Sequence, residues 1–222
     1  MKILIACEES DEVRGRFEKI GLDAWSCDIK PNRNKKAKHL QCDLLEILNN
    51  NWDAVIAFPP CTHLAVSGAA WFEQKRKDGR QNEAIEFFLK IANLDIKHIA
   101  IENPVGIMSN IYRKPDQIIH PYFFGDPVRK NTCLWLKGLP KLIHNEKINL
   151  FENNITHVKP NIVKYGNKTY SGPAAKWYKT AEERSTERSK TYPGIAQAMT
   201  DQWGKFLINN KTKQHEQRKQ TN

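Results

Sequence analysis

AVIAFPPCTHLAVSG, residues 54–68, begins as an apolar run and breaks at Pro59 and Pro60, directly before Cys61. A continuous apolar run such as 52–58 is typical of a strand buried inside a parallel sheet. Proline fixes φ and donates no hydrogen bond, so two in a row end the strand and stiffen the backbone that follows. The stretch therefore predicts a strand end that presents Cys61 on rigid backbone. A small, inert, buried thiol is the alternative.

Short apolar runs and segments of helical periodicity alternate along the first half of the chain. Strands are expected at 2–7, 23–29, 52–58 and 98–103, and helices at 11–20, 43–48 and 82–92. This alternation predicts an α/β fold with a mainly parallel sheet, right-handed crossovers and helices on both faces. Ligands of such sheets bind outside the carboxyl ends of the strands.

The length and composition of the chain are those of one globular domain. Of its 222 residues, 40% are hydrophobic and 27% are charged, which is ordinary for a protein that buries a core without disulfides. We expect a single domain over 1–208, with a small irregular insert at about 142–190. The polar segment 209–222 is expected to be a disordered tail.

The cysteine pattern and the lack of long apolar runs indicate the compartment. The five cysteines are an odd number without a Cys-x-x-Cys pair, which argues against a zinc site and a disulfide framework. No apolar run approaches the ~18 residues of a membrane span, and the apolar start is too short for a signal peptide. These features predict a cytoplasmic protein with neither a metal nor a membrane partner.

The net charge of +10 favours an anionic partner such as nucleic acid. Basic residues concentrate at 159–192, where aromatic residues lie between them, and a smaller excess lies at 30–38. Because cations bind phosphates and aromatic rings stack on unpaired bases, 159–192 is a candidate nucleic-acid surface. A solvated loop with a few packed aromatic rings is the alternative. The predicted contact residues are Lys164, Lys168, Lys176 and Trp177.

Polar residues follow the predicted strands at their carboxyl ends, which meet at one edge of a parallel sheet. A carboxylate at the end of the second strand, here Asp28, often binds the ribose of an adenosine cofactor. A turn or helix N-cap is the alternative role for such an aspartate. The first strand-to-helix turn has no glycine to admit a pyrophosphate, which favours an adenosine cofactor without one. The residues at this edge are Cys7, Glu8, Asp28, Pro60, Cys61, Glu102 and Asn103.

Four stretches of the chain match the motifs of one enzyme family in their order. FPPCTHLAVSG (58–68) is similar to a Pro-Cys nucleophile loop, and IAIENP (99–104) to a Glu-Asn strand end. FFGDPVRKNTCLWL (123–136) and TYPGIAQAMTDQW (191–203) match a later strand and the last helix. The chain thus resembles the cytosine-C5 DNA methyltransferases, especially the short members found in phages and prophages. The resemblance implies a Rossmann-like fold that uses S-adenosylmethionine, in a bacterial or phage-infected cytosol.

By this resemblance, Cys61 attacks C6 of cytosine and so makes C5 nucleophilic enough to accept a methyl group. Glu102 would assist at N3, and Asn103 would orient the loop. The resemblance and the strand ends together predict S-adenosylmethionine contacts from Cys7, Glu8, Asp28, Ile29, Asp43, Phe58 and Pro60. The predicted DNA contacts, besides the basic segment, are Ser67, Arg80, Arg129 and Lys130.

The sequence departs from the family pattern at three places. The glycine-rich first turn is ACEES (6–10) here, where Glu8 or Glu9 can bind the methionine ammonium or simply begin a helix. The arginine that contacts cytosine in the family is Thr132 here, so Arg129 or Lys130 is expected to replace it. The insert is too short for a full target-recognition domain, which predicts low sequence specificity.

Two other functions stay open at this level. The same scaffold could modify C5 of cytosine in RNA or in a free nucleotide. The altered first turn and Thr132 also fit a catalytically silent nucleic-acid-binding protein. His63 lies two residues after Cys61 and can either assist its thiolate or be a solvated loop residue. The tryptophans at 25, 52, 71, 135 and 203 are expected to pack in the core or at its rim.

Overall fold

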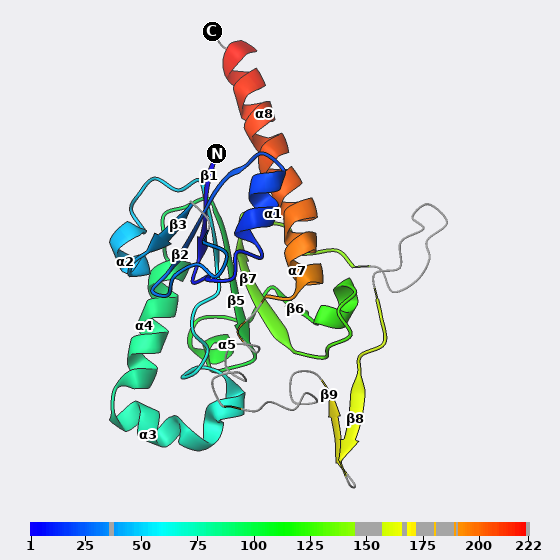
Figure 1. Ribbon diagram of the computed structural model, residues 1–222. Coiled ribbons are helices and arrows are strands. Elements are labelled where there is room, and N and C mark those ends of the chain that lie inside the picture. The colour runs from blue at the N-terminus through cyan, green and yellow to red at the C-terminus, as the bar shows by residue number, and fades with distance from the viewer. Residues whose placement is uncertain are drawn as a thin grey trace.

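The computed structural model describes residues 1–35, 38–144, 157–165, 168–171, 180, 189 and 191–220. Its centre is a seven-stranded sheet with the strand order β3-β2-β1-β4-β5-β7-β6 (Figure 1). Strand β7 runs antiparallel to both of its neighbours, and the other pairs are parallel. The strands are β1 (Lys2–Ala6), β2 (Asp23–Asp28), β3 (His39–Gln41), β4 (Ala54–Ala57), β5 (His98–Pro104), β6 (Gln117–Ile119) and β7 (Thr132–Lys137).

The expected α/β architecture is confirmed, and the strand order is that of a methyltransferase-like Rossmann fold. The order reverses between β1 and β4, whose side chains are almost all buried because helices cover both faces of the sheet. A reversal of this kind opens a crevice at the carboxyl ends of the strands, where ligands bind in doubly wound sheets.

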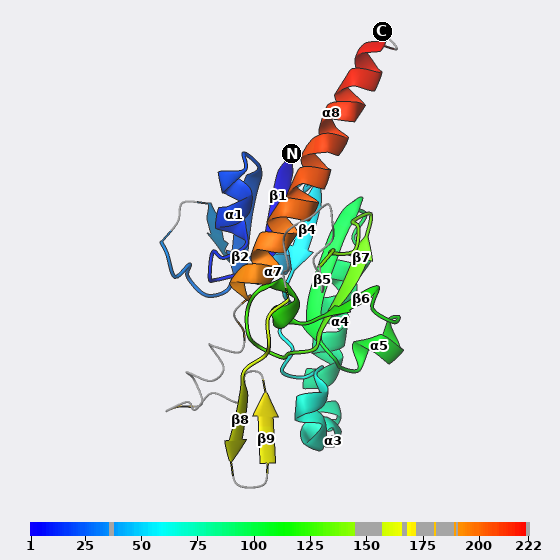
Figure 2. The same ribbon diagram turned by 90° about the vertical axis from the view of Figure 1, so that its right-hand side faces the viewer.

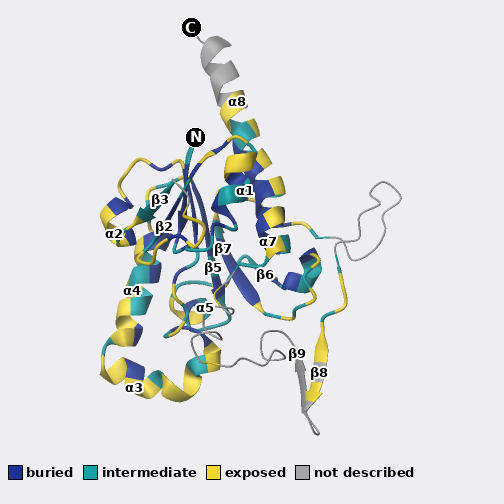
Figure 3. Cartoon of the chain, viewed as in Figure 1, coloured by how far each residue is buried: buried dark blue, intermediate teal, exposed yellow. Residues whose placement is uncertain are grey.

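Alternate residues of β1 belong to two separate cores. Ile3 and Ile5 pack with Phe17 and Trp203 on one face, whereas Leu4 packs with other apolar side chains on the opposite face. The first core involves α1 (Arg14–Lys19) and the continuous helix α7 (Pro193–Ala198), η4 (Met199–Gly204) and α8 (Lys205–Gln220). The second involves α2 (Leu44–Ile47) and α4 (Arg80–Ala92). Figure 3 shows the buried strands between these partly exposed helices.

Short helices lie around the carboxyl edge of the sheet. They are η1 (Val66–Trp71), α3 (Phe72–Lys77), α5 (Met108–Ile111) and η2 (Pro121–Phe124). An antiparallel hairpin of β8 (Ile162–Tyr165) and β9 (Lys168–Ser171) falls in the segment expected to be irregular. Figures 1 and 2 show the hairpin beyond the carboxyl ends of the parallel strands, on the same side of the sheet as α3.

Helix α8 differs from the disordered tail that composition predicted, since it is helical through Gln220. Lysine, glutamine and arginine are good helix formers, and the helix continues from the buried Leu207 of the core. Among the described residues, no helix is both long and apolar enough to cross a membrane.

Candidate functional site at the carboxyl edge of the sheet

The loop after β4 and the end of β5 are joined by a buried hydrogen bond. The side-chain amide of Asn103 is 1% exposed, and its Nδ2 donates to the carbonyl oxygen of Pro59 at 2.8 Å. Cys61 follows two residues later, and Glu102 precedes the donor. One contact therefore brings together the two motifs that the sequence singled out, and the orienting role of Asn103 in the reaction stays a prediction.

Backbone contacts fasten the same loop to the segment after β5. The amides of Leu64 and Ala65 both donate to the carbonyl of Cys61 at 3.0 Å, which closes a turn. The amide of Ile107 donates to the carbonyl of Leu64 at 3.0 Å. A Cβ at Gly106 would lie 2.2 Å from that same carbonyl oxygen, so only glycine permits this approach. The Cys61 loop is therefore held in one conformation by its surroundings.

Two buried polar side chains support the outer side of the loop, and sequence reasoning missed both. Nζ of Lys75 donates to the carbonyl of Thr62 at 2.7 Å, and Nε2 of Gln81 donates to the carbonyl of His63 at 3.1 Å. Both side chains belong to residues less than 9% exposed. Their residue types are common on helix surfaces, so no local signal in the sequence marks them.

Cys61 differs in exposure from the cysteines of the core. It is partly exposed, whereas Cys27 and Cys133 are buried, and none of the five cysteines, all in the described chain, forms a disulfide. Burial raises the pKa of Cys133 to about 11 and moves the pKa of Cys7 still further above its usual range. A thiol of high pKa is a poor nucleophile at neutral pH. Cys7 and Cys133 are therefore poor candidates for a nucleophile, whereas the partly exposed Cys61 lies on the loop that is joined to the Glu102 strand end.

Glu102 lines a small pocket together with Lys130. Its carboxylate lies 3.9 Å from Nζ of Lys130, while Arg129 is exposed, so Lys130 is the one of the two predicted cations that lies beside Glu102. The hydroxyl of Thr132 also lines the pocket, and it is buried without a hydrogen-bond partner in the described structure. A carboxylate and donor groups therefore line the same small pocket. The remaining lining includes Phe58, Tyr192 and Ile195.

The turn between β1 and α1 contains no glycine, but its first residue has a backbone conformation that glycine usually adopts. Cys7 has a φ of 59°, in the left-handed region that side chains rarely adopt. The next residue, Glu8, is 3% exposed and accepts hydrogen bonds from the amides of Val13 and Arg14 at 2.6 and 3.1 Å. Glu8 therefore caps the start of α1, which is the alternative that the sequence left open. Its role in binding a cofactor stays a prediction.

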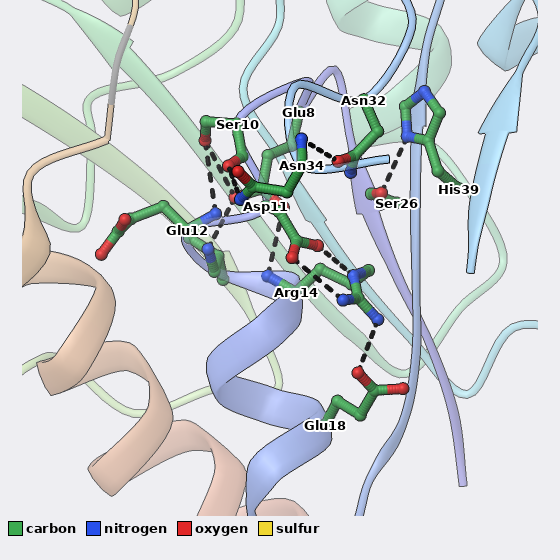
Figure 4. A network of polar contacts seen from close by, with 11 residues as sticks. Glu8, Ser10, Asp11, Glu12, Arg14, Glu18, Ser26, Asn32, Asn34 and His39 are labelled. Carbon is green, nitrogen blue, oxygen red and sulfur yellow. Dashed lines mark hydrogen bonds and ion pairs between the residues drawn. The ribbon is translucent and has the colours of Figure 1, made fainter. Parts of the chain in front are cut away.

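The capping network around Glu8 includes a buried ion pair. Arg14 is 1% exposed and pairs with Asp11 and Glu18 at the start of α1 (Figure 4). Burial raises the pKa of Glu8 to about 7, although its two backbone hydrogen bonds act in the opposite direction. A carboxyl of this kind can change protonation near neutral pH without leaving its place.

Asp28 at the end of β2 accepts a hydrogen bond from the amide of Lys30 at 2.9 Å, which is the turn role that the sequence left open, and its part in cofactor binding stays a prediction. Asp28 is half-buried, and burial raises its pKa above the ordinary value of an aspartate. The next residue, Ile29, is 74% exposed although it is large and apolar. A carboxylate can accept both ribose hydroxyls, and an exposed aliphatic side chain can cover a purine ring. Asp43 is exposed and caps α2 through the amide of Leu45 at 2.9 Å.

The predicted nucleic-acid contacts are scattered over this side of the molecule. Ser67 is exposed on η1, and Lys164 is exposed on β8. Arg80 pairs with Asp78 at the start of α4. Lys168 belongs to β9, and Lys176 and Trp177 lie outside the described residues.

Of the five tryptophans expected to pack in the core or at its rim, three are buried, Trp25 is half-buried and Trp71 is exposed. Trp52, Trp135 and Trp203 are at most 6% exposed, as predicted. The packing prediction for Trp71 is wrong, since this residue of η1 is 63% exposed. Among the described residues, no three histidine, cysteine or acidic residues are grouped as metal ligands.

Comparisons with known proteins add the following. No protein-family model matches the chain, and a comparison with curated proteins gives no match either. Among solved structures, the chain is similar to EhMeth, a methyltransferase of Entamoeba histolytica, with a TM-score of 0.47 and 16% sequence identity. The similarity covers 73% of this chain, which spans only 58% of the length of that one. A likeness this distant says nothing of activity, and the fold assignment rests on the strand order.

Proposed function

We propose that this protein uses S-adenosylmethionine to methylate C5 of cytosine in DNA, with Cys61 as the nucleophile. The observation that carries the proposal is the hydrogen bond from Asn103 to the carbonyl of Pro59, which joins the Cys61 loop to the Glu102 strand end. Covalent catalysis on a pyrimidine needs a nucleophile and a proton donor held at a constant separation. The anchored loop meets that need.

Cys61 and Glu102 have separate roles in the proposed reaction. The thiolate of Cys61 forms a bond to C6 of cytosine, and the electron pair of the C5–C6 double bond moves toward N3. Glu102 donates a proton or a hydrogen bond at N3, and Lys130 lies beside it at 3.9 Å. C5 becomes nucleophilic and takes a methyl group. Loss of the C5 proton and departure of the thiolate then restore the aromatic ring.

S-adenosylmethionine supplies an electrophilic methyl group when it is bound. The residues at the first two strand ends fit its adenosine, since Asp28 can accept the ribose hydroxyls and the exposed Ile29 can cover the ring. Glu8 already caps α1, so any contact it makes with the methionine ammonium would be additional. Asp43 and Phe58 complete the proposed lining of this part of the edge.

DNA as the substrate is supported by charge. The net charge is +10, and Lys164 is exposed on a hairpin that extends beyond the sheet edge. A base in duplex DNA must leave the stack to reach a thiol at a loop. The polar groups of Glu102, Lys130 and Thr132, which line one small pocket, would then lie beside the polar edge of that base.

A transfer assay tests the proposal directly. Labelled methyl groups should move from S-adenosylmethionine to duplex DNA, and Cys61→Ala should abolish transfer while cofactor affinity stays within a few-fold. Duplex DNA that contains 5-fluorocytosine should trap a covalent adduct, because fluorine cannot leave as a proton does. The adduct should map to Cys61 by peptide mass spectrometry.

The same assay separates the alternatives. Transfer to RNA or to dCMP in place of DNA would keep the chemistry and change the substrate. Binding of DNA without transfer to any cytosine would favour a silent nucleic-acid-binding protein. An adduct on another cysteine, or full activity of Cys61→Ala, would overturn the assignment of the nucleophile.

A further inference from the structure

Lys75 of α3 has an unusual environment for a lysine. The residue is 8% exposed, and its Nζ donates to the carbonyl of Thr62 at 2.7 Å. In the described chain, no carboxylate lies within ion-pair distance of this ammonium. Lysine is rarely buried without a paired charge, because removal of an ammonium from water is unfavourable. A buried, unpaired cation thus lies against the residue that directly follows Cys61.

The surroundings of Lys75 keep its ammonium close to the loop. A Cβ at Gly68 would lie 3.1 Å from Nζ, so the small residue there leaves room for the lysine end. The ring of Phe72 lies 6.0 Å from the same atom. Lys77, two residues further along the same helix, is instead exposed and pairs with Glu73 at 2.9 Å. The two lysines of α3 therefore have opposite environments.

The charge of Lys75 already acts on a titrating neighbour of Cys61. The pKa of His63 is lowered, first by burial and next by the positive charges of Lys75 and Arg80. Asp78 and Glu83 act on the pKa of His63 in the opposite direction. Lys75 and Arg80 thus disfavour an imidazolium at His63, and of these two cations Lys75 is the one that binds a carbonyl of the loop.

We propose that Lys75 is a positioning residue for Cys61, whose ammonium holds the Thr62 carbonyl and supplies the buried positive charge that favours the thiolate. A nearby ammonium is one of the settings that make a cysteine reactive. The inference rests on the proposed role of Cys61, but it concerns the state of the thiol and not the transfer of a methyl group.

Alkylation of Cys61 by iodoacetamide as a function of pH tests this inference without substrate or cofactor. Peptide-resolved mass spectrometry separates Cys61 from the other cysteines. In the wild-type protein, the midpoint should lie below about 8.5, the value of an unperturbed cysteine. Lys75→Met should raise that midpoint, so that the alkylation rate at pH 7 falls about 3–10-fold, as expected for a shift of half to one pH unit.

Matched variants separate charge from packing. Lys75→Arg should restore the low midpoint, and Lys77→Met, which removes an exposed charge from the same helix, should leave it unchanged. A Lys75→Met protein with a lower melting temperature and an unchanged midpoint would show a merely structural lysine and overturn the proposal. If Lys75→Met does not fold, Lys75→Gln is the second uncharged variant. A wild-type midpoint at or above about 8.5 overturns the proposal by itself.

The outcome is independent of the proposed function. A low, Lys75-dependent midpoint in a protein that methylates nothing would support this inference and contradict the methyltransferase proposal. Active enzyme with a Lys75-independent midpoint would do the reverse. In an active enzyme, the rising limb of the activity–pH profile should also move to higher pH in Lys75→Met and not in Lys77→Met.

Discussion

Asn103 Nδ2 and the carbonyl oxygen of Pro59 are 2.8 Å apart in space and 44 residues apart in the chain. Proline has no amide proton, so the loop that begins with Pro59 and Pro60 can form few regular backbone hydrogen bonds. The buried amide of Asn103 compensates by binding the carbonyl from the neighbouring strand. The side chain of Asn103 is therefore one of the contacts that set the position of Cys61 relative to Glu102, together with the backbone hydrogen bonds of the loop.

We expect Asn103→Ala to destabilise the protein by about 1–3 kcal/mol, because the carbonyl of Pro59 would stay buried without its partner. Methyl transfer should fall by more than the loss of folded protein explains, because the Cys61 loop is then no longer held in a constant position relative to Glu102. Urea unfolding and the transfer assay measure the two effects. Asn82→Ala on the exposed side of α4 is the control and should change the free energy of unfolding by less than about 0.5 kcal/mol. Equal effects of both variants would contradict this role of Asn103.

We expect Glu8→Gln to remove a pH dependence of stability. The pKa of Glu8 is raised to about 7 in the folded protein, so between about pH 4.5 and 7 the folded state binds more protons than the unfolded state. The stability contributed by protonated Glu8 is therefore present below the unfolded pKa and lost as pH rises toward 7, by up to about 3 kcal/mol.

Urea unfolding of wild type and Glu8→Gln between pH 4.5 and 8 measures this difference. The stability of wild type relative to the variant should decline as pH rises through this window. Glu46→Gln, at an exposed position of α2, should follow the wild-type curve. A difference between wild type and Glu8→Gln that does not vary with pH would contradict the raised pKa of Glu8.

We expect Asp28→Ala to weaken S-adenosylmethionine binding by roughly 1–3 kcal/mol, since buried hydroxyls of the ribose would lose their acceptor. Asp43→Ala should have a smaller effect, because Asp43 is exposed. Titration calorimetry measures both. Asp95→Ala removes an exposed aspartate away from the edge and should leave the affinity unchanged. Unchanged isotherms for Asp28→Ala and Asp43→Ala would mean that the cofactor does not bind at this edge.

We expect the basic segment 159–192 to bind nucleic acid mainly through phosphates. Combined Ala substitutions at Lys164, Lys168 and Lys176 should flatten the log–log dependence of DNA affinity on salt by about 2–3 units. The loss should be similar for unrelated DNA sequences. Trp177→Ala should weaken binding by roughly 1–3 kcal/mol if its ring stacks on a base.

The matched control is the other basic stretch. Ala substitutions at Lys30, Lys35 and Lys38 remove the same charge from 30–38 and should leave the salt dependence nearly unchanged. A wild-type slope in the first triple variant together with a flattened slope in the second would move the nucleic-acid surface to 30–38.

The sequence by itself determined the layers and the edge at which the site lies. Runs such as 54–57 and 98–101 are buried on both faces of the sheet, so nearly all of their residues are apolar. Strands of this kind can therefore be predicted from a short stretch of sequence. Prolines after one run and Glu102–Asn103 at the end of the other mark where the strands end. The Cys61–Glu102 pairing followed, because parallel strands end at a common edge.

Only the tertiary structure decided which polar groups are buried there and what they contact. Lys75 and Gln81 have residue types typical of a helix surface, and their burial depends on a loop that packs over them. The capping role of Glu8 depends on where α1 begins, and Gly106 is needed because another chain segment passes close to it. Long-range contacts of this kind leave no local period in the sequence, because each depends on residues distant along the chain.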